Sequence, residues 1–505
     1  MKLDSLKKIR LESQSIKVNA VFNAIYQILV LLAPLITTPY ISRVLGVEAI
    51  GNYQYCYSIV SYFTLLSAYG FSTFGTQKIA EVRDNKEKRS SIFWNIMISK
   101  SLISLLCLCI YFILTLALFS GTELLMFFAM TLYIVSVLID PTFYFQGREN
   151  FVSISIRNII VRIFTISLIF ILIKSPDDMV FYALILSSSN FLASFIIYFS
   201  FRKSINKPNF KNIHILQTLK EAFPYFMPEL AASLFTSLNQ TLLGSLTGSD
   251  AQSGYYAQAV KFSGLITAFA GSLSVIMLSR VSYLHAQHDE AQIRRKINLA
   301  FHALWVIGLP CVFGICAISN VFVPIFLGPG YEPVINLIYI VASIGILSPV
   351  NTFYGNVYFK AYNKIWYQVG ILLFAAIIST VLNILLDKQL GATGCAIASL
   401  AAEACQVPLL MFFSRKAMNH KGIFKSIIKP LDASLIMLIC VLFFNRFFSS
   451  HISTIFLLIA DLIIGVLVYG GCILLFKDDF ALPLVKSILH KFKNILTKRK
   501  IQKGK

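Results

Sequence analysis

The sequence has little charge, and acidic residues are especially scarce. Only 13% of its 505 residues are charged, and 23 Asp and Glu stand against 44 Lys and Arg. Soluble globular domains carry about 25% charged residues, so this composition excludes an ordinary soluble fold. The polar stretches between apolar runs are also too short to form a soluble domain. With 57% apolar residues, the chain is typical of an all-α integral membrane protein.

The sequence also lacks motifs for catalysis, nucleotide hydrolysis and metal binding. A GxxxxGK[ST] loop does not occur, which excludes a P-loop motor. The nine cysteines lie mostly inside apolar runs without metal-ligand spacing, and His285 and His288 have no third ligand nearby. No Ser/His/Asp, paired-carboxylate or cysteine-nucleophile pattern stands out. We therefore predict no enzyme activity, no catalytic residue, no metal site, no cofactor and no disulfide framework.

Long apolar runs recur along most of the chain, and each is long enough to cross a bilayer as a helix. The first lacks a small-residue cleavage site, so we expect an uncleaved helix rather than a signal peptide. We predict about fourteen spans, at residues 18–42, 52–76, 92–118, 123–146, 151–173, 178–200, 222–245, 253–279, 298–319, 333–358, 365–387, 392–414, 427–447 and 453–476.

The net charge of +21 follows the predicted topology rather than indicating a nucleic-acid surface. If the N-terminus is cytoplasmic, the external segments hold only four basic residues, Arg43, Lys174, Lys388 and Arg446, and most others are cytoplasmic. The positive-inside rule then predicts a multi-pass protein of the cytoplasmic (inner) membrane with both termini in the cytoplasm. The external connections are short: VEAIG, SGTE, KSPDD, TGSDAQ, LGPGYE and DKQLGA. The first of them predicts a turn at 48–51.

Two pairs of segments indicate an internal repeat. Around the first turn, Gly46 and Gly51 match Gly248 and Gly254, and residues 144–150 match residues 358–364 at an offset of 214. These offsets predict two parallel six-helix lobes, at 1–200 and 201–420, followed by two additional helices at 421–476 and a basic cytoplasmic tail at 477–505. Two lobes facing each other would enclose the central cavity that alternating access requires.

Several motifs resemble a known group of membrane proteins. They are PxISRVLGxxxxGxY, then SIVxYFxLLxxYGFxxxGTxxIAxxRD, YFQGRENF at the end of the fourth span and LGxxGCAIASLxAE at the twelfth. They are similar to Wzx-type polysaccharide flippases, whose superfamily includes the multidrug and toxin extruders and the lipid II flippases. The resemblance covers almost the whole chain and is most specific at residues 36–84. It implies alternating-access transport of a polyprenyl-diphosphate-linked oligosaccharide to the outer leaflet, for O-antigen, lipopolysaccharide or capsule.

Five basic residues within or at the ends of the spans are candidate substrate-binding residues: Arg43, Lys100, Arg157, Arg162 and Lys261. A buried ionisable side chain in a membrane is costly and points to function, and guanidinium groups suit diphosphate oxygens. Simpler roles stay open for each. Arg157 and Lys261 would reach a membrane interface, Arg43 would anchor the turn, and Lys100 and Arg162 would form internal ion pairs.

Glu229 and Glu403 lie inside predicted spans and are candidate ion-coupling residues for H⁺ or Na⁺; the alternative is that they neutralise the cations. Asp140 reads as a boundary residue, and Asp461 lies outside both lobes. The expected partners are the lipid-linked oligosaccharide, the bilayer and other polysaccharide-assembly membrane proteins. Two other functions remain open: an ion-coupled multidrug-type exporter, and a membrane glycosyltransferase or polymerase of the same pathway.

Overall fold

The described chain consists almost entirely of helices, most of them long enough to cross a membrane, as the sequence predicts. The structure, a computed structural model, describes residues 16–200, 205–208, 213–415, 418, 420–449 and 451–483, and these contain no strand. The all-α integral membrane class is confirmed. A bilayer core offers the backbone no hydrogen-bond partner, so an apolar run must bond within itself as a helix. Most of the predicted basic tail, from residue 484, lies outside the described residues.

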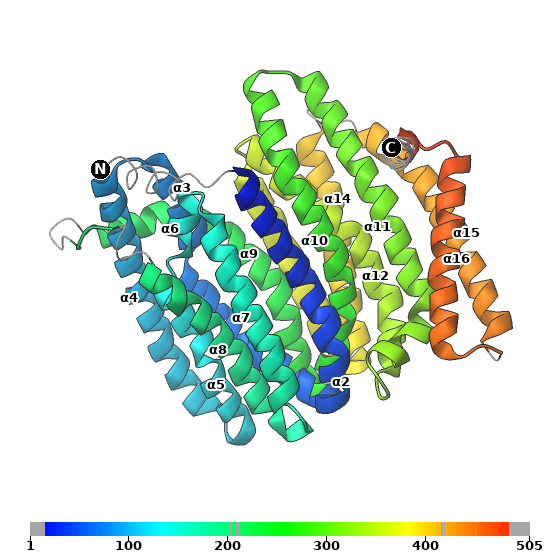
Figure 1. The fold of residues 1–505 in the computed structure, drawn as a ribbon, viewed down its shortest axis with the longest axis horizontal. Coiled ribbons are helices and arrows are strands. Elements are labelled where there is room, and N and C mark those ends of the chain that lie inside the picture. The colour runs from blue at the N-terminus through cyan, green and yellow to red at the C-terminus, as the bar shows by residue number, and fades with distance from the viewer. Residues whose placement is uncertain are drawn as a thin grey trace, which may run out of the picture. The chain divides into compact units, whose positions relative to one another are not determined.

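The helices follow one another through short connections (Figure 1). In the first half they are α2 (Ile16–Ala68), α3 (Phe71–Glu81), α4 (Lys86–Leu118), α5 (Gly121–Ile139), α6 (Thr142–Gly147), α7 (Phe151–Leu172), the 3₁₀ turn η1 (Pro176–Asp178), α8 (Met179–Ser200) and α9 (Ile215–Thr247). They continue with α10 (Asp250–Ala286), α11 (Glu290–Phe326), α12 (Glu332–Phe353), the π-helical turn η3 (Tyr354–Phe359), α13 (Ile365–Leu390), α14 (Ala392–Ser414), α15 (His420–Phe448) and α16 (Thr454–Leu475).

Eleven helical segments of the described chain are long and apolar enough to cross a membrane. The first of these joins two predicted spans through α2 and α3. The comparatively polar α9 and α10 fall outside the eleven, although they coincide with the predicted seventh and eighth spans. Each predicted span thus overlaps helix, but span 52–76 is interrupted at Tyr69 and Gly70 and span 123–146 at Asp140 and Pro141. The exact count of fourteen crossings stays a prediction.

The described chain forms two compact units. One extends to Ala257 and also contains Asn383–Gly391, and the other contains Gln258–Leu382 and the described residues from Ala392 onward. In the first unit, α5 packs along α8, and α2 contacts α5, α7 and α9. In the second, α11 packs against α12 and α15, and α15 lies beside α16 (Figure 1). The boundaries of the predicted lobes stay a prediction.

The first reversal of the chain lies at a single residue of α2. Gly46 has φ 77° and ψ 176°, and helix resumes directly at Val47. The predicted turn at 48–51 is therefore wrong, because the glycine alone supplies the break. A residue with a side chain rarely adopts this positive φ, whereas glycine does so without steric strain. Residues 48–51 instead form the first turn of the second segment of α2, residues 47–68.

The backbone repeats its local conformation at the predicted offset of 214. Glu149 has φ 56° and its counterpart Asn363 has φ 54°. The amide of Asn150 donates to the carbonyl of Phe145 at 2.9 Å, and the amide of Lys364 donates to that of Phe359 at 2.7 Å. The same chain reversal thus follows α6 and η3, which supports the sequence alignment at this point.

A close helix crossing joins the glycines of the other predicted repeat pair. A Cβ added at Gly51 would lie 1.7 Å from the Asp250 carbonyl oxygen, and one added at Gly254 would lie 2.3 Å from the Val47 carbonyl oxygen. The second segment of α2 and the start of α10 therefore pack backbone against backbone. Asn52 donates to the Asp250 carboxylate at 3.1 Å beside this crossing. Small residues permit such close approach between membrane helices.

Candidate functional site

Two of the predicted basic residues contact the junction between the end of α5 and the start of α6. Lys100 on α4 is 4% exposed, and its Nζ donates to the backbone carbonyl of Asp140. Arg157 on α7 donates to Thr142 Oγ1 at 3.4 Å and to Asn158 Oδ1 at 2.7 Å, and Thr142 donates to the Asp140 carboxylate. The structure thus brings Lys100 and Arg157 to one junction. There both cations already have polar partners within the protein.

Arg162, one to two turns further along α7, has a different environment. Its buried Nε has no hydrogen-bond partner among the described residues. The guanidinium lies close enough to Tyr133 on α5 and Tyr182 on α8 for an electrostatic interaction. Tyr53 on α2 completes the surroundings, with its hydroxyl 3.2 Å from that of Tyr133. A buried N–H without a partner is unfavourable, so Arg162 has the capacity to donate to an added anionic group.

The remaining two predicted cations are not part of this arrangement. Arg43 is exposed on α2, three residues before the Gly46 break. Tyr26, earlier on the same helix, is close enough to Arg157 for an electrostatic interaction. Arg43 follows Tyr26 by about 25 Å of helix and therefore lies far from Arg157. Lys261 is exposed on α10 and belongs to the second compact unit.

Both predicted ion-coupling carboxylates have partners inside the protein. Thr73 of α3 donates to Glu229 Oε1 at 3.2 Å. Glu403 on α14 is 6% exposed, and its carboxylate accepts from the side-chain amides of Asn351 and Gln406. These bonds offset part of the penalty for burying the groups.

A third carboxylate, Asp387 on α13, was not predicted as a site residue. It is 0% exposed, and both of its oxygens lack a hydrogen-bond partner among the described residues. Asn383 lies one turn earlier and donates to Asn239 Oδ1 on α9 at 2.8 Å, while its own Oδ1 has no partner. The predicted eleventh span ended at residue 387, but α13 continues to Leu390 and buries the carboxylate. An Asn and an Asp four residues apart in an apolar run would have been the sequence signal.

This buried oxygen cluster has the chemistry of a site for a small hard cation. Carboxylate and amide oxygens suit Na⁺-like ions, and a single carboxylate matches a single positive charge. A proton on Asp387 is the other species that would neutralise it. Within the part of the chain that the structure describes, no group of three His, Cys, Asp or Glu residues could hold a metal ion.

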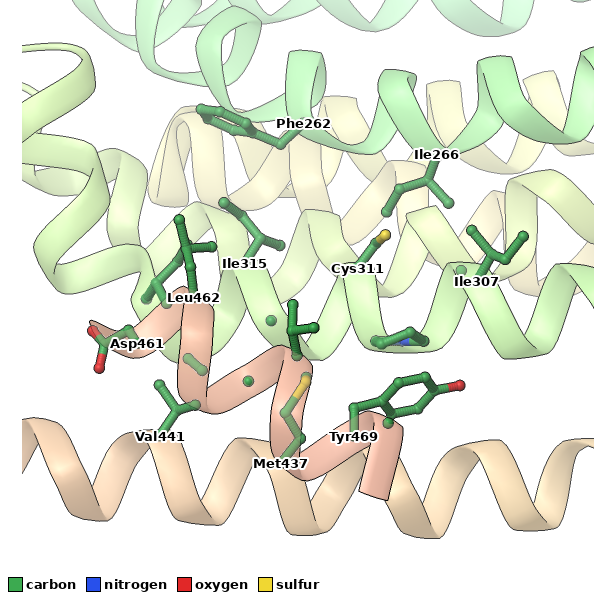
Figure 2. Close-up of a pocket in the computed structure, with 18 residues that line it drawn as sticks. Phe262, Ile266, Ile307, Cys311, Ile315, Met437, Val441, Asp461, Leu462 and Tyr469 are labelled. Carbon is green, nitrogen blue, oxygen red and sulfur yellow. The ribbon is translucent and has the colours of Figure 1, made fainter. Parts of the chain in front are cut away.

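The second unit contains an apolar groove between its helices (Figure 2). The cavity has a volume of about 760 Å³. Its walls come from α10, α11, α15 and α16. They comprise Phe262, Ile266, Ile307, Gly308, Pro310, Cys311, Gly314, Ile315, Ala317, Ile318, Met437, Val441, Asp461, Leu462, Gly465, Val466, Tyr469 and Gly470. The two helices that follow the predicted second lobe therefore form a wall of this groove. No pattern in the sequence indicated this groove.

Sequence comparisons relate the chain to proteins of surface-polysaccharide synthesis. The family described as "Polysaccharide biosynthesis protein" matches residues 16–277, more than half of the chain. A protein of Escherichia coli (strain K12) named "Putative O-antigen transporter" is 26% identical over 414 residues, covering 79% of this chain and 97% of that protein. The "Uncharacterized membrane protein EpsK" of Bacillus subtilis (strain 168) is 24% identical over 427 residues, covering 79% and 83%.

Solved structures share the fold at lower sequence identity. The lipid II flippase MurJ in an inward closed conformation matches with a TM-score of 0.68 and 20% identity, covering 92% of this chain and 99% of that one. An inward-facing multidrug resistance transporter of the MATE family matches with a TM-score of 0.57 and 14% identity, covering 78% and 95%. At these identities the likeness concerns the fold alone.

Proposed function

The chain belongs to the polysaccharide biosynthesis protein family, and from this we propose that it is a flippase for lipid-linked oligosaccharides rather than an enzyme. Its substrate would be a polyprenyl-diphosphate-linked repeat unit, moved to the outer leaflet for O-antigen, lipopolysaccharide or capsule synthesis. The proposed location is the cytoplasmic membrane, with both termini in the cytoplasm. Other membrane proteins of polysaccharide assembly would deliver or receive the substrate. The O-antigen transporter name of the Escherichia coli relative supports this proposal.

The observation that carries the proposal is the apolar groove of α10, α11, α15 and α16. A flippase for such a substrate must shelter a long isoprenoid chain as well as a charged head. The groove walls are almost entirely hydrocarbon, with Gly314 and Gly465 leaving space on α11 and α16. A polyprenyl chain fits these walls because burial of apolar surface is favourable and the hydrocarbon has no polar group that would need a hydrogen-bond partner.

For the charged head, Arg162 is the best-placed of the predicted cations. Lys100 and Arg157 already bond to protein oxygens, whereas the Nε of Arg162 has no partner among the described residues. A diphosphate oxygen would satisfy that donor, and the nearby tyrosine hydroxyls would bond to sugar or phosphate. Arg43 and Lys261 stay predicted substrate contacts.

A coupling cation, H⁺ or Na⁺, would bind at Asp387 in preference to Glu229 or Glu403. The two predicted carboxylates have hydrogen-bond donors, whereas both oxygens of Asp387 lack one. Coupling at Glu229 and Glu403 stays a prediction, as does alternating access between two six-helix lobes. A small-molecule exporter would share the fold, but the apolar groove favours a lipid-linked substrate.

The test is complementation of a bacterial strain that lacks its own flippase and supplies the matching lipid-linked repeat unit. We expect the wild-type protein to restore surface polysaccharide and Arg162→Ala to lower it at least about tenfold, equivalent to about 1.4 kcal/mol. Arg446→Ala is the control, because Arg446 is an exposed arginine near the end of α15. Normal polymer from Arg162→Ala at equal membrane abundance would contradict the assignment of the head group. Failure of the wild-type protein would contradict the proposed function itself.

A further inference from the structure

One acidic residue of the apolar groove has no role in the function proposed above. Asp461 lies on α16 and is 1% exposed. It follows the start of the helix at Thr454 by about 10 Å, well inside the thickness of a bilayer core. Figure 2 shows it at one end of the groove beside Val441 and Leu462. Asp461 is therefore an ionisable side chain that lies at membrane depth and lines a cavity.

The groove around Asp461 contains no cation, and the side-chain amide of Asn445 is the polar group beside it among the described residues. Neither carboxylate oxygen has a hydrogen-bond partner among the described residues. Asn445 on α15 is its polar neighbour but does not reach hydrogen-bond geometry with it, and the Oδ1 of Asn445 also lacks a partner.

The titratable groups that share the groove are Cys311 from α11 and Tyr469 from α16 itself. The Tyr469 hydroxyl already donates to the Val306 carbonyl at 2.6 Å. From α10 and α15 only uncharged side chains line the cavity, so none of the described groove residues is a cation.

An isolated carboxylate in hydrocarbon is unstable, and it either keeps contact with water or takes up a proton. Both carboxylate oxygens are hidden from solvent, so water in an empty groove would stabilise the charge from a short distance rather than by direct contact. When a chain fills the groove, that water leaves and the neutral acid becomes the favoured form. We propose that Asp461 binds a proton when an apolar lipid chain occupies the groove, so that chain binding and protonation are linked.

This inference rests on the groove being the chain-binding site of the proposed function. The proton comes from the solvent and binds one oxygen of Asp461, and it is released when the chain leaves. Because the occupied form holds more protons than the empty form, affinity for the chain must fall as pH rises. The limiting slope for one linked proton is about tenfold per pH unit. The protein would thereby bind its lipid more tightly where protons are more abundant.

The test uses the full-length purified protein in lipid nanodiscs and a radiolabelled long-chain polyprenol. Polyprenol has no group that titrates in this range, so a pH dependence of binding belongs to the protein. We expect wild-type affinity to weaken by up to about tenfold per pH unit from mildly acidic to mildly alkaline pH. Asp461→Asn should bind at all pH values with the affinity of the acidic wild-type protein. Asp432→Asn is the matched control, an exposed aspartate on the adjacent α15, and should behave as wild type.

A second measurement needs no variant. Addition of polyprenol to wild-type protein in weak buffer should remove up to about one proton per bound chain, reported by a pH-indicator dye. Identical pH profiles for wild type and Asp461→Asn would overturn the proton linkage while leaving the groove assignment intact. Binding that depends on Na⁺ but not on pH would overturn it as well. Absence of polyprenol binding at every pH would overturn the groove assignment and the linkage together.

Discussion

The close crossing of α2 and α10 gives the sharpest prediction about packing. Gly51→Ala would place a Cβ 1.7 Å from the Asp250 carbonyl oxygen and 2.8 Å from the Gly254 amide nitrogen. An ordinary contact is about 3.5 Å, so the two backbones would have to separate by roughly 2 Å. That shift also breaks the hydrogen bond from Asn52 to Asp250. Gly51→Ala should therefore weaken the packing of the first compact unit.

The size of the effect follows from two opposing terms. Exchanging glycine for alanine within a helix stabilises it by about 0.5–1 kcal/mol through lost chain entropy. Forcing a methyl group into a filled contact typically costs about 1–3 kcal/mol, and the broken hydrogen bond adds about 1 kcal/mol. We expect Gly51→Ala to be less stable than wild type by about 1–3 kcal/mol, since the clash exceeds the helix gain.

The assay is thermal unfolding of the purified protein in detergent, combined with complementation of surface polysaccharide. Gly271→Ala is the control, because that glycine lies on α10, the partner helix of this crossing, and an added Cβ there has no atom within 4 Å. Gly271→Ala should match or slightly exceed wild-type stability. If Gly51→Ala were as stable and as active as Gly271→Ala, the close backbone contact would be refuted.

Two further predictions concern the proposed cation-binding site at Asp387 and the apolar groove. Asp387→Asn keeps the shape of the side chain but removes its charge, so Na⁺ binding by the purified protein should fall at least about tenfold. Asp432→Asn, at an exposed position of α15, should leave it unchanged, and equal binding by both variants would contradict the Asp387 site. A Cβ at Gly465 would make only an ordinary 3.7 Å contact with Met437, so Gly465→Leu should fold, project into the groove and weaken polyprenol binding at least about tenfold. Gly471→Leu, on the exposed side of α16, should bind polyprenol normally; equal affinity of the two leucine variants would refute occupation of the groove.

Much of the fold could be read from the sequence because a bilayer leaves an apolar run few options. A segment of about twenty apolar residues has to satisfy its own backbone bonds, and helix is the way to do so. All predicted spans therefore overlap helices, although two of them contain a break, and the motif at residues 36–84 already indicated the polysaccharide family. The predicted position of the first turn was wrong because Gly46 alone reverses the chain. The polar residues that follow Gly46 suggested a longer turn.

The site was less accessible to sequence reasoning. In water, an amphipathic pattern marks the inner face of a helix, but lipid and protein core are both apolar, so a membrane helix shows little such pattern. On α4, Ile113 is 67% exposed and Tyr111 is fully buried, although both are large apolar residues in one run. The sequence therefore places Lys100 and Arg162 within the membrane, but it does not show that Lys100 has a hydrogen-bond partner whereas the Nε of Arg162 has none among the described residues.

The sequence by itself determined the class, the helices and the family, since these depend on local apolar length and on contiguous motifs. Only the tertiary structure decided which buried polar groups have partners. Asp387 looked like the end of a helix, and Asp461 lay outside the predicted lobes. Their importance came from the helices that surround them, because burial and the absence of hydrogen-bond donors are properties of neighbours far away in the chain. The groove of α10, α11, α15 and α16 depends on such neighbours in the same way.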